Sequence, residues 1–102
     1  MARYVLAYHG GGASADSDRA AQQRNAFTDW IHELGNAVVD PGTPLSHSKT
    51  VSSGGVFDTA ESNRLTGFSI IQATSIEEAI EIARDCPFLQ TGTIELAEVM
   101  KM

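Results

Sequence analysis

Two segments of this chain carry apolar side chains on both faces of a predicted strand. Residues 3–9 read RYVLAYH and are followed by three glycines, and residues 65–73 read LTGFSIIQA. Successive side chains of a strand point to opposite faces, so both faces of each segment are apolar. This pattern is typical of central strands that are covered on both sides.

The segment between residues 17 and 34 has helical rather than strand periodicity. Its apolar residues share one helical face: Ala20, Phe27, Trp30, Ile31 and Leu34. Residues 14–18 offer several N-terminal caps, and the Gly35-Asn36 pair is a C-terminal stop signal. We therefore expect a helix that packs on the sheet, with Trp30 buried between them.

A second helix begins after the strand at residues 65–73. Ser75 and Glu78 have the spacing of a capping box, and Pro87 ends the helical pattern. The expected buried stripe consists of Ile76, Ala79, Ile80 and Ala83. Cys86, the only cysteine, cannot form an internal disulfide and is expected to pack in the core as a small apolar group.

Three weaker signals complete the order of elements. They are a short strand at residues 37–40, a weak strand at 46–52 and a last strand at 93–100, with residues 58–64 as loop. The order predicts one α+β domain over residues 1–102, a ferredoxin-like βαββαβ antiparallel sheet with order 4-1-3-2. Two helices cover one face, so we expect a second subunit on the other, over Val5, Ala7, Ile70 or Ile71, Ala97 and Val99.

Charge and composition narrow the classes of partner. The 102 residues carry a formal net charge of −6, which disfavours nucleic acid. Apolar runs are far shorter than the ~20 residues that span a bilayer, and the N-terminus lacks a signal-peptide pattern. The sequence therefore predicts a soluble, cytoplasmic protein with neither nucleic-acid nor membrane partners.

The chain resembles the YCII-related family, which includes the DGPF-motif proteins. The resemblance rests on ordered segments at residues 4–8 (YVLAY), 30–35 (WIHELG), 42–45 (GTPL), 48–51 (SKTV), 65–69 (LTGFS) and 75–79 (SIEEA). It implies a dimeric α/β barrel, in which the sheets of two ferredoxin-like subunits pack face to face.

Two departures separate this chain from some members of that family. Those members pair a helix-one histidine with an acid, and the corresponding positions here fall near Arg24 and Glu33. His32 comes too late in the helix to replace that histidine. The DGPF segment reads VFDTAE at residues 56–61. Catalysis by the family dyad is therefore not carried over.

A candidate ligand site is predicted at one edge of the sheet. His9 and Asp40 end strands that run in the same direction, and Thr66 begins the strand between them. The polar residues Ser46, His47, Ser48 and Lys49 follow in an insert over residues 46–64 that can close over this edge. A histidine and a carboxylate there can transfer protons or can simply line a hydrated rim.

Other motifs near this edge carry less chemistry. The HGGG sequence at residues 9–12 has no GxSxG partner, so esterase chemistry is not indicated. The three histidines lack metal-ligand spacing, and neither a metal nor a cofactor is implied. Two hypotheses remain: a small-molecule-binding protein or enzyme with its pocket at the sheet edge or dimer cleft, and a non-catalytic dimeric interaction or regulatory module.

Overall fold

The computed structural model describes residues 1–11, 17–60 and 63–100. Its elements, including two short 3-10 helices (η), are β1 (Ala2–Gly10), α1 (Ser17–Leu34), η1 (Gly35–Ala37), β2 (Val38–Asp40), β3 (Lys49–Ser52), β4 (Gly55–Asp58), β5 (Leu65–Ala73), α2 (Ile76–Arg84), η3 (Pro87–Gln90) and β6 (Gly92–Glu98). The predicted caps at residues 14–16, Gly12 of the glycine loop, and residues 61–62 of the predicted loop lie outside these ranges.

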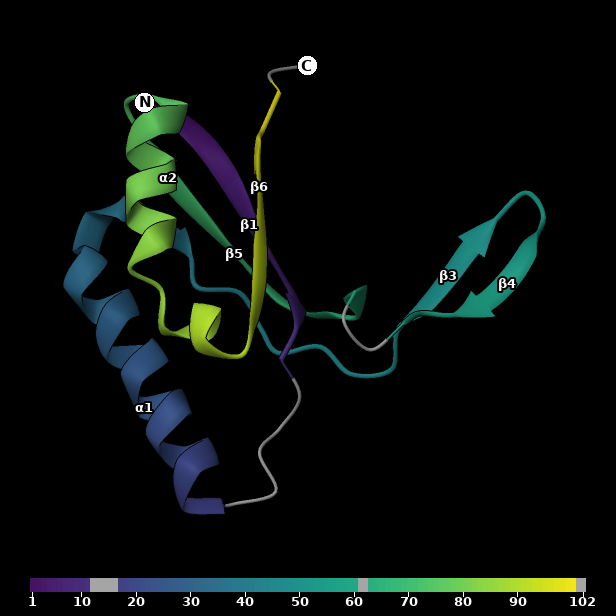
Figure 1. Cartoon of the computed structure of the whole chain (residues 1–102). Helices are drawn as coiled ribbons and strands as arrows, with labels where there is room; N and C mark the ends of the chain where they lie inside the picture. The colour runs from purple at the N-terminus through teal and green to yellow at the C-terminus, as the bar shows by residue number, and fades with distance from the viewer. Residues whose placement is uncertain (12–16, 61–62, 101–102) are drawn as a thin grey trace.

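The main sheet has the order β2-β5-β1-β6 with antiparallel neighbours. Both helices lie on one side of it (Figure 1). With the separate β3–β4 pair set aside, this is the predicted strand order. The α+β ferredoxin-like fold is thereby confirmed.

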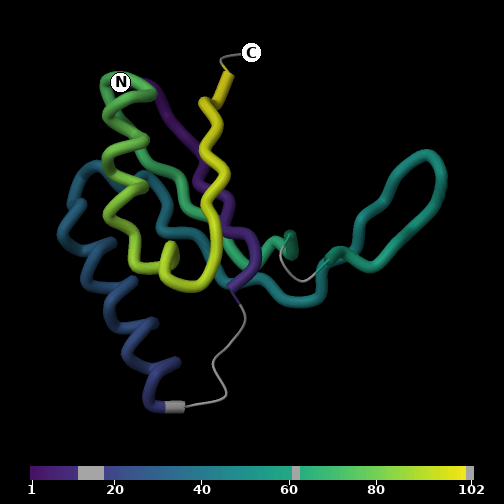
Figure 2. Tube along the Cα trace, in the orientation of Figure 1, coloured from purple at the N-terminus to yellow at the C-terminus, as the bar shows by residue number. Residues whose placement is uncertain are grey.

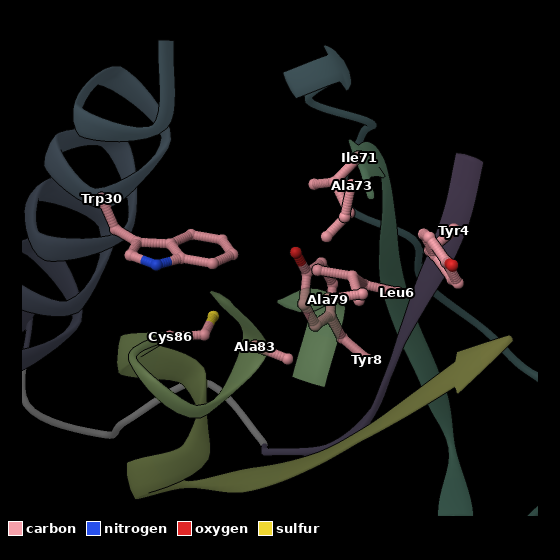
Figure 3. Packing of buried hydrophobic residues seen from close by; sticks show 9 residues of the cluster. All are labelled: Tyr4, Leu6, Tyr8, Trp30, Ile71, Ala73, Ala79, Ala83 and Cys86. Atoms are coloured by element: carbon pink, nitrogen blue, oxygen red, sulfur yellow. The ribbon is translucent and has the colours of Figure 1, made fainter. Parts of the chain in front are cut away.

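The core lies between the helices and one face of the sheet (Figure 3). Tyr4, Leu6 and Tyr8 of β1 point to this face and are at most 4% exposed. Trp30 of α1 is 6% exposed and packs in the same cluster, with Cys86 also buried there. The predicted burial of Trp30 and Cys86 is confirmed.

Helix α2 begins as the capping box predicts but turns a different face inward. The Ser75 hydroxyl accepts a hydrogen bond from the Glu78 backbone amide at 3.2 Å. Ala79 and Ala83 are buried, whereas Ile76 and Ile80 are 42% and 44% exposed. The predicted stripe is wrong at these two isoleucines, because the helix is rotated so that the small alanines face the sheet.

Neither of the two α-helices that the structure describes covers the opposite side of the sheet (Figure 1). We call this surface the open face and define it by Val5, Ala7, Phe68, Ile70 and Ala97. Val5 lies opposite both Ile70 and Ala97, and Ala7 lies opposite Phe68. The apolar character of both faces of β1 and β5 is confirmed.

Strands β3 and β4 form a separate two-stranded hairpin, which we call the arm. The arm projects from the sheet on the side away from the helices (Figure 2). Each of its eight strand residues is exposed. The weak strand expected at residues 46–52 contains β3, whereas the sequence pattern does not predict β4.

Candidate functional site

His9 is held at the end of β1 by two acceptors. Its Nδ1 lies 3.1 Å from the backbone oxygen of Asn63, and its Nε2 lies 3.1 Å from Oε1 of Glu95. The Asn63 carbonyl oxygen can only accept a hydrogen bond, so an Nδ1–H group of the ring donates to it. The His9 side chain is 18% exposed and that of Glu95 is 73% exposed.

Glu95 contacts His9, although it is not among the residues expected at this edge of the sheet. It lies on β6 opposite Ala7, so it projects from the open face diagonally beside His9. The alternation of β6 places Glu95 on the face opposite Ile94 and Leu96. That signal is visible in the sequence, but pairing with His9 also requires the register between β1 and β6.

A bulge in the pairing of β1 with β5 fixes the backbone around His9. Tyr8 pairs with Gly67, whereas His9 pairs with Leu65, so Thr66 has no partner in the register. The Thr66 hydroxyl donates to the carbonyl of Tyr8 at 3.2 Å. Thr66 is therefore near the predicted site, with its hydroxyl engaged by the backbone.

A cavity of about 460 Å³ lies where the arm joins the sheet. Its lining residues are Leu45, Ser46, His47, Ser48, Lys49, Thr50, Thr59, Asn63 and Leu65. The predicted insert residues are thus brought together. His9 adjoins the cavity through two of its lining residues. Asn63 accepts a hydrogen bond from the His9 ring, and Leu65 pairs with His9 in the sheet.

Backbone hydrogen bonds anchor the cavity wall to β5. Pro44 forms a bridge to Gly67, and the Leu45 amide donates to the Thr66 carbonyl at 2.9 Å. The Ser48 hydroxyl donates to the Leu65 carbonyl at 3.2 Å. These bonds extend the β2 side of the sheet toward His9 after β2 itself has ended.

His47 and Lys49, two residues of the cavity wall, differ in what constrains them. His47 has a φ of +54°, which places a non-glycine residue in the left-handed region. Lys49 forms a salt bridge with Asp58 across the base of the arm. The cavity therefore contains a strained histidine and a lysine whose charge is locally balanced.

Asp40 does not share the edge with His9. Asp40 lies opposite Ile70, and Ile70 also pairs with Val5 on β1. Val5 is four residues from His9, which corresponds to about 13 Å along the strand. The Oδ1 atom of Asp40 accepts a hydrogen bond from the Gly42 amide at 2.8 Å. The expectation that Asp40 and His9 lie on the same edge is wrong, because β2 has only three residues. The chain that follows Asp40 reaches the His9 end instead.

A buried hydroxyl pair holds this following chain in place. The Tyr8 hydroxyl donates to Ser69 Oγ at 2.7 Å, and Ser69 Oγ donates to the Pro41 carbonyl at 2.8 Å. Burial raises the pKa of Tyr8 well above its ordinary value, so its hydroxyl remains protonated. This chain of bonds positions the cavity wall and is not itself exposed to a ligand.

A larger groove of about 700 Å³ lies between α1 and α2. Its lining includes the carboxylates Asp29, Glu33, Glu78, Glu81 and Asp85. Among its lining residues in the described part of the chain, none is a histidine or carries a basic side chain. Within residues 1–11, 17–60 and 63–100, no group of three or more His, Cys, Asp or Glu side chains is arranged to hold a metal ion.

The only cysteine of the sequence lies in the core. Cys86 is buried, and this burial raises the pKa of its thiol to about 11. The thiol is therefore protonated at neutral pH and is a poor nucleophile.

Among the helices that the structure describes, none is long and apolar enough to cross a membrane.

Comparison with solved structures gives a neighbour for the whole fold. It is 5-chloro-2-hydroxyhydroquinone dehydrochlorinase from Burkholderia phenoliruptrix AC1100, solved in complex with 2,5-dihydroxybenzoquinone. The TM-score is 0.60 at 15% identity, covering 95% of this chain and 93% of that one. At this identity the likeness shows the fold.

Comparison of the sequence with known proteins identifies the family. No curated protein matches the chain. The profile of the YCII-related domain matches residues 2–102, nearly the entire sequence. The ordered segments that suggested this resemblance lie within that range. The chain therefore belongs to the YCII-related domain family.

Proposed function

We propose that this domain binds a small oxygenated molecule in the cavity at the base of the arm, beside His9. One observation carries the proposal: the Asn63 carbonyl holds the His9 ring while Asn63 itself lines the cavity. A rigidly placed imidazole thus adjoins a cavity whose volume of about 460 Å³ falls in the range of small-molecule sites.

The lining defines the chemical class of the ligand. The lining residues include four that bear hydroxyls, Ser46, Ser48, Thr50 and Thr59, together with His47, Lys49, Leu45 and Leu65. Hydroxyl, imidazole and ammonium donors suit a flat molecule that carries phenolate, carboxylate or quinone oxygens. The solved neighbour was crystallised with a molecule of this class, which supports the proposal.

His9 supplies acid–base chemistry at the rim of this cavity. The Asn63 carbonyl fixes the proton on Nδ1, so Nε2 is the nitrogen that exchanges a proton. Glu95 contacts Nε2 from β6 and is largely exposed, so its carboxylate can turn toward water and leave Nε2 free to exchange a proton with solvent. Enzymatic turnover through His9 is part of the proposal.

Thr66 and Asp40 take positioning roles in this account. Thr66 fixes the bulge beside His9 through the Tyr8 carbonyl. Asp40 fixes the turn at Gly42 that starts the cavity wall. Both residues thus act on the ligand through the backbone that they hold.

We also propose that the protein is a homodimer in which a second copy covers the open face. The half-buried Val5, Ala7, Phe68 and Ile70 support this arrangement. A non-catalytic interaction module is the alternative, and the exposed apolar side chains of the arm are the observation in its favour. Binding of a small molecule distinguishes the proposed ligand-binding protein from this interaction module.

The test is a thermal-shift screen of oxygenated aromatic and carboxylate compounds that includes 2,5-dihydroxybenzoquinone. A ligand that binds the native state raises Tm, and calorimetry then gives its affinity. We expect His9→Ala and Lys49→Ala to weaken binding at least tenfold without changing the fold. His32→Ala, an exposed position on α1, is the matched control. Equal affinity in all four proteins, or no stabilisation across the screen, would reject the proposal.

A further inference from the structure

The arm lacks a packing partner within the described part of the chain. Val51, Val56 and Phe57 are 74%, 64% and 55% exposed. The arm consists of two four-residue strands, and isolated two-stranded hairpins are marginally stable in water. An arm of this kind therefore gains stability by packing against another surface.

Each face of the arm carries an apolar side chain among polar ones, and the charge of the arm is balanced. Val51 pairs with Val56 on one face, and Phe57 pairs with Thr50 on the other. Lys49 and Asp58 neutralise each other at the base. Because the whole chain carries −6, a neutral arm can approach a second copy without the repulsion that its acidic surfaces would meet.

The position of the arm associates it with the open face. Figure 1 shows the helices on one side of the sheet and the arm on the other, where the open face lies. Any molecule that covers the open face therefore sits on the same side as the arm. The arm base also forms the cavity, so this molecule approaches the cavity as well.

The area of the open face is smaller than the area that a stable interface buries. A sheet with the strand lengths seen here presents a face of about 450 Å², given the usual strand spacing and rise. A stable interface buries roughly 800 Å² on each partner. The open face alone falls short of that area, and the arm supplies additional apolar surface.

We propose that the arm packs against a second copy of this chain, so that the cavity at its base lies at the junction of two subunits. The inference rests on the proposed homodimer and adds a role for the arm. In a twofold dimer each copy offers one arm and one open face, so both arms are buried by the same symmetric contact. The partner then closes the cavity that one chain leaves open.

Sedimentation of arm variants is the first test. The triple variant Val51→Ser, Val56→Ser, Phe57→Ser alters exposed side chains, so each chain is expected to fold as before. Wild-type protein should sediment at twice the 10.9 kDa of one chain, and the variant's dimer dissociation constant should rise at least tenfold. The matched control, Ile76→Ser and Ile80→Ser, changes exposed apolar residues on α2 and should leave the dimer unchanged.

A spin label identifies what the arm touches. Copies with Cys86→Ser and Val56→Cys carry a nitroxide at position 56, and they are mixed dilute with ¹⁵N-labelled wild-type copies and then concentrated. We expect broadening of wild-type amide signals around Val5, Ala7 and Ile70. A nitroxide on an exposed position of α1, in Cys86→Ser with His32→Cys, should leave those signals sharp.

The outcomes separate this inference from the proposed function. A dimer that persists in the triple variant, a monomeric wild type, or a label at position 56 that broadens no wild-type signal would each overturn the arm contact. Capture of a different protein by a monomeric chain would do so as well. If no compound in the screen stabilises the protein but the triple variant dissociates as expected, the ligand site is rejected and the arm contact is supported.

Discussion

Gly42 should be among the most sensitive positions in the chain, although it lies in a turn outside the core. It has a φ of +81°, and a Cβ added there would lie 1.5 Å from the carbonyl oxygen of Phe68. A non-glycine residue in the left-handed region costs about 1–2 kcal/mol. The clash is with backbone, so the turn must also move and lose the Gly42 amide bond to Asp40, worth about 1.5–3 kcal/mol.

We therefore expect Gly42→Ala to lower the free energy of unfolding by about 2.5–5 kcal/mol, out of roughly 5–15 kcal/mol for a typical domain. Urea denaturation followed by circular dichroism measures this loss. Gly35→Ala is the matched control, since Gly35 has a φ of +55° but no atom within 4 Å of the added Cβ. It should cost about 1 kcal/mol. Equal losses in the two variants would refute the steric argument at Gly42.

Trp30→Ala should lower the free energy of unfolding by about 3–5 kcal/mol, because the indole is buried, and a wild-type urea midpoint would contradict this burial. Burial raises the pKa of Cys86 to about 11, so the stability that its neutral thiol contributes is complete below pH ~8.5 and is lost as the pH rises toward 11. Between pH 8 and 10 the wild type should therefore lose roughly 1–2 kcal/mol more than Cys86→Ala in urea titrations, and parallel losses would contradict the shift. Ser69→Ala should cost about 1–3 kcal/mol, because the buried Tyr8 hydroxyl and the Pro41 carbonyl both lose their partner, and an unchanged midpoint would show that water replaces Ser69.

The fold was largely predictable because its signals are local. The alternation in β1 and β5, the helical stripe ending at Leu34 and the Ser75 cap each depend on residues close in sequence. The rotation of α2 was not predictable in this way. Ile76 and Ile80 share a stripe with the alanines, and only packing against the sheet decides which side faces inward.

The site depends more on register than on local pattern. His9 and the insert at residues 46–49 are flagged by their residue types, and the structure places them beside one another. Asp40 lies about 13 Å along the strand direction because the length of β2 sets its partner on β5. Glu95 is recognisable only after β6 is aligned with β1, since a shift of one residue would turn it to the other face.

The most direct test of the proposed site is an NMR titration of ¹⁵N-labelled protein with the strongest compound from the thermal-shift screen. We expect saturable shifts in the backbone amides of residues 45–50, Thr59, Asn63 and Leu65, together with the ring signals of His9. Amides of the acidic groove between α1 and α2, such as those of Asp29 and Glu81, should stay fixed. Shifts confined to that groove would contradict the account and place the ligand site between the helices.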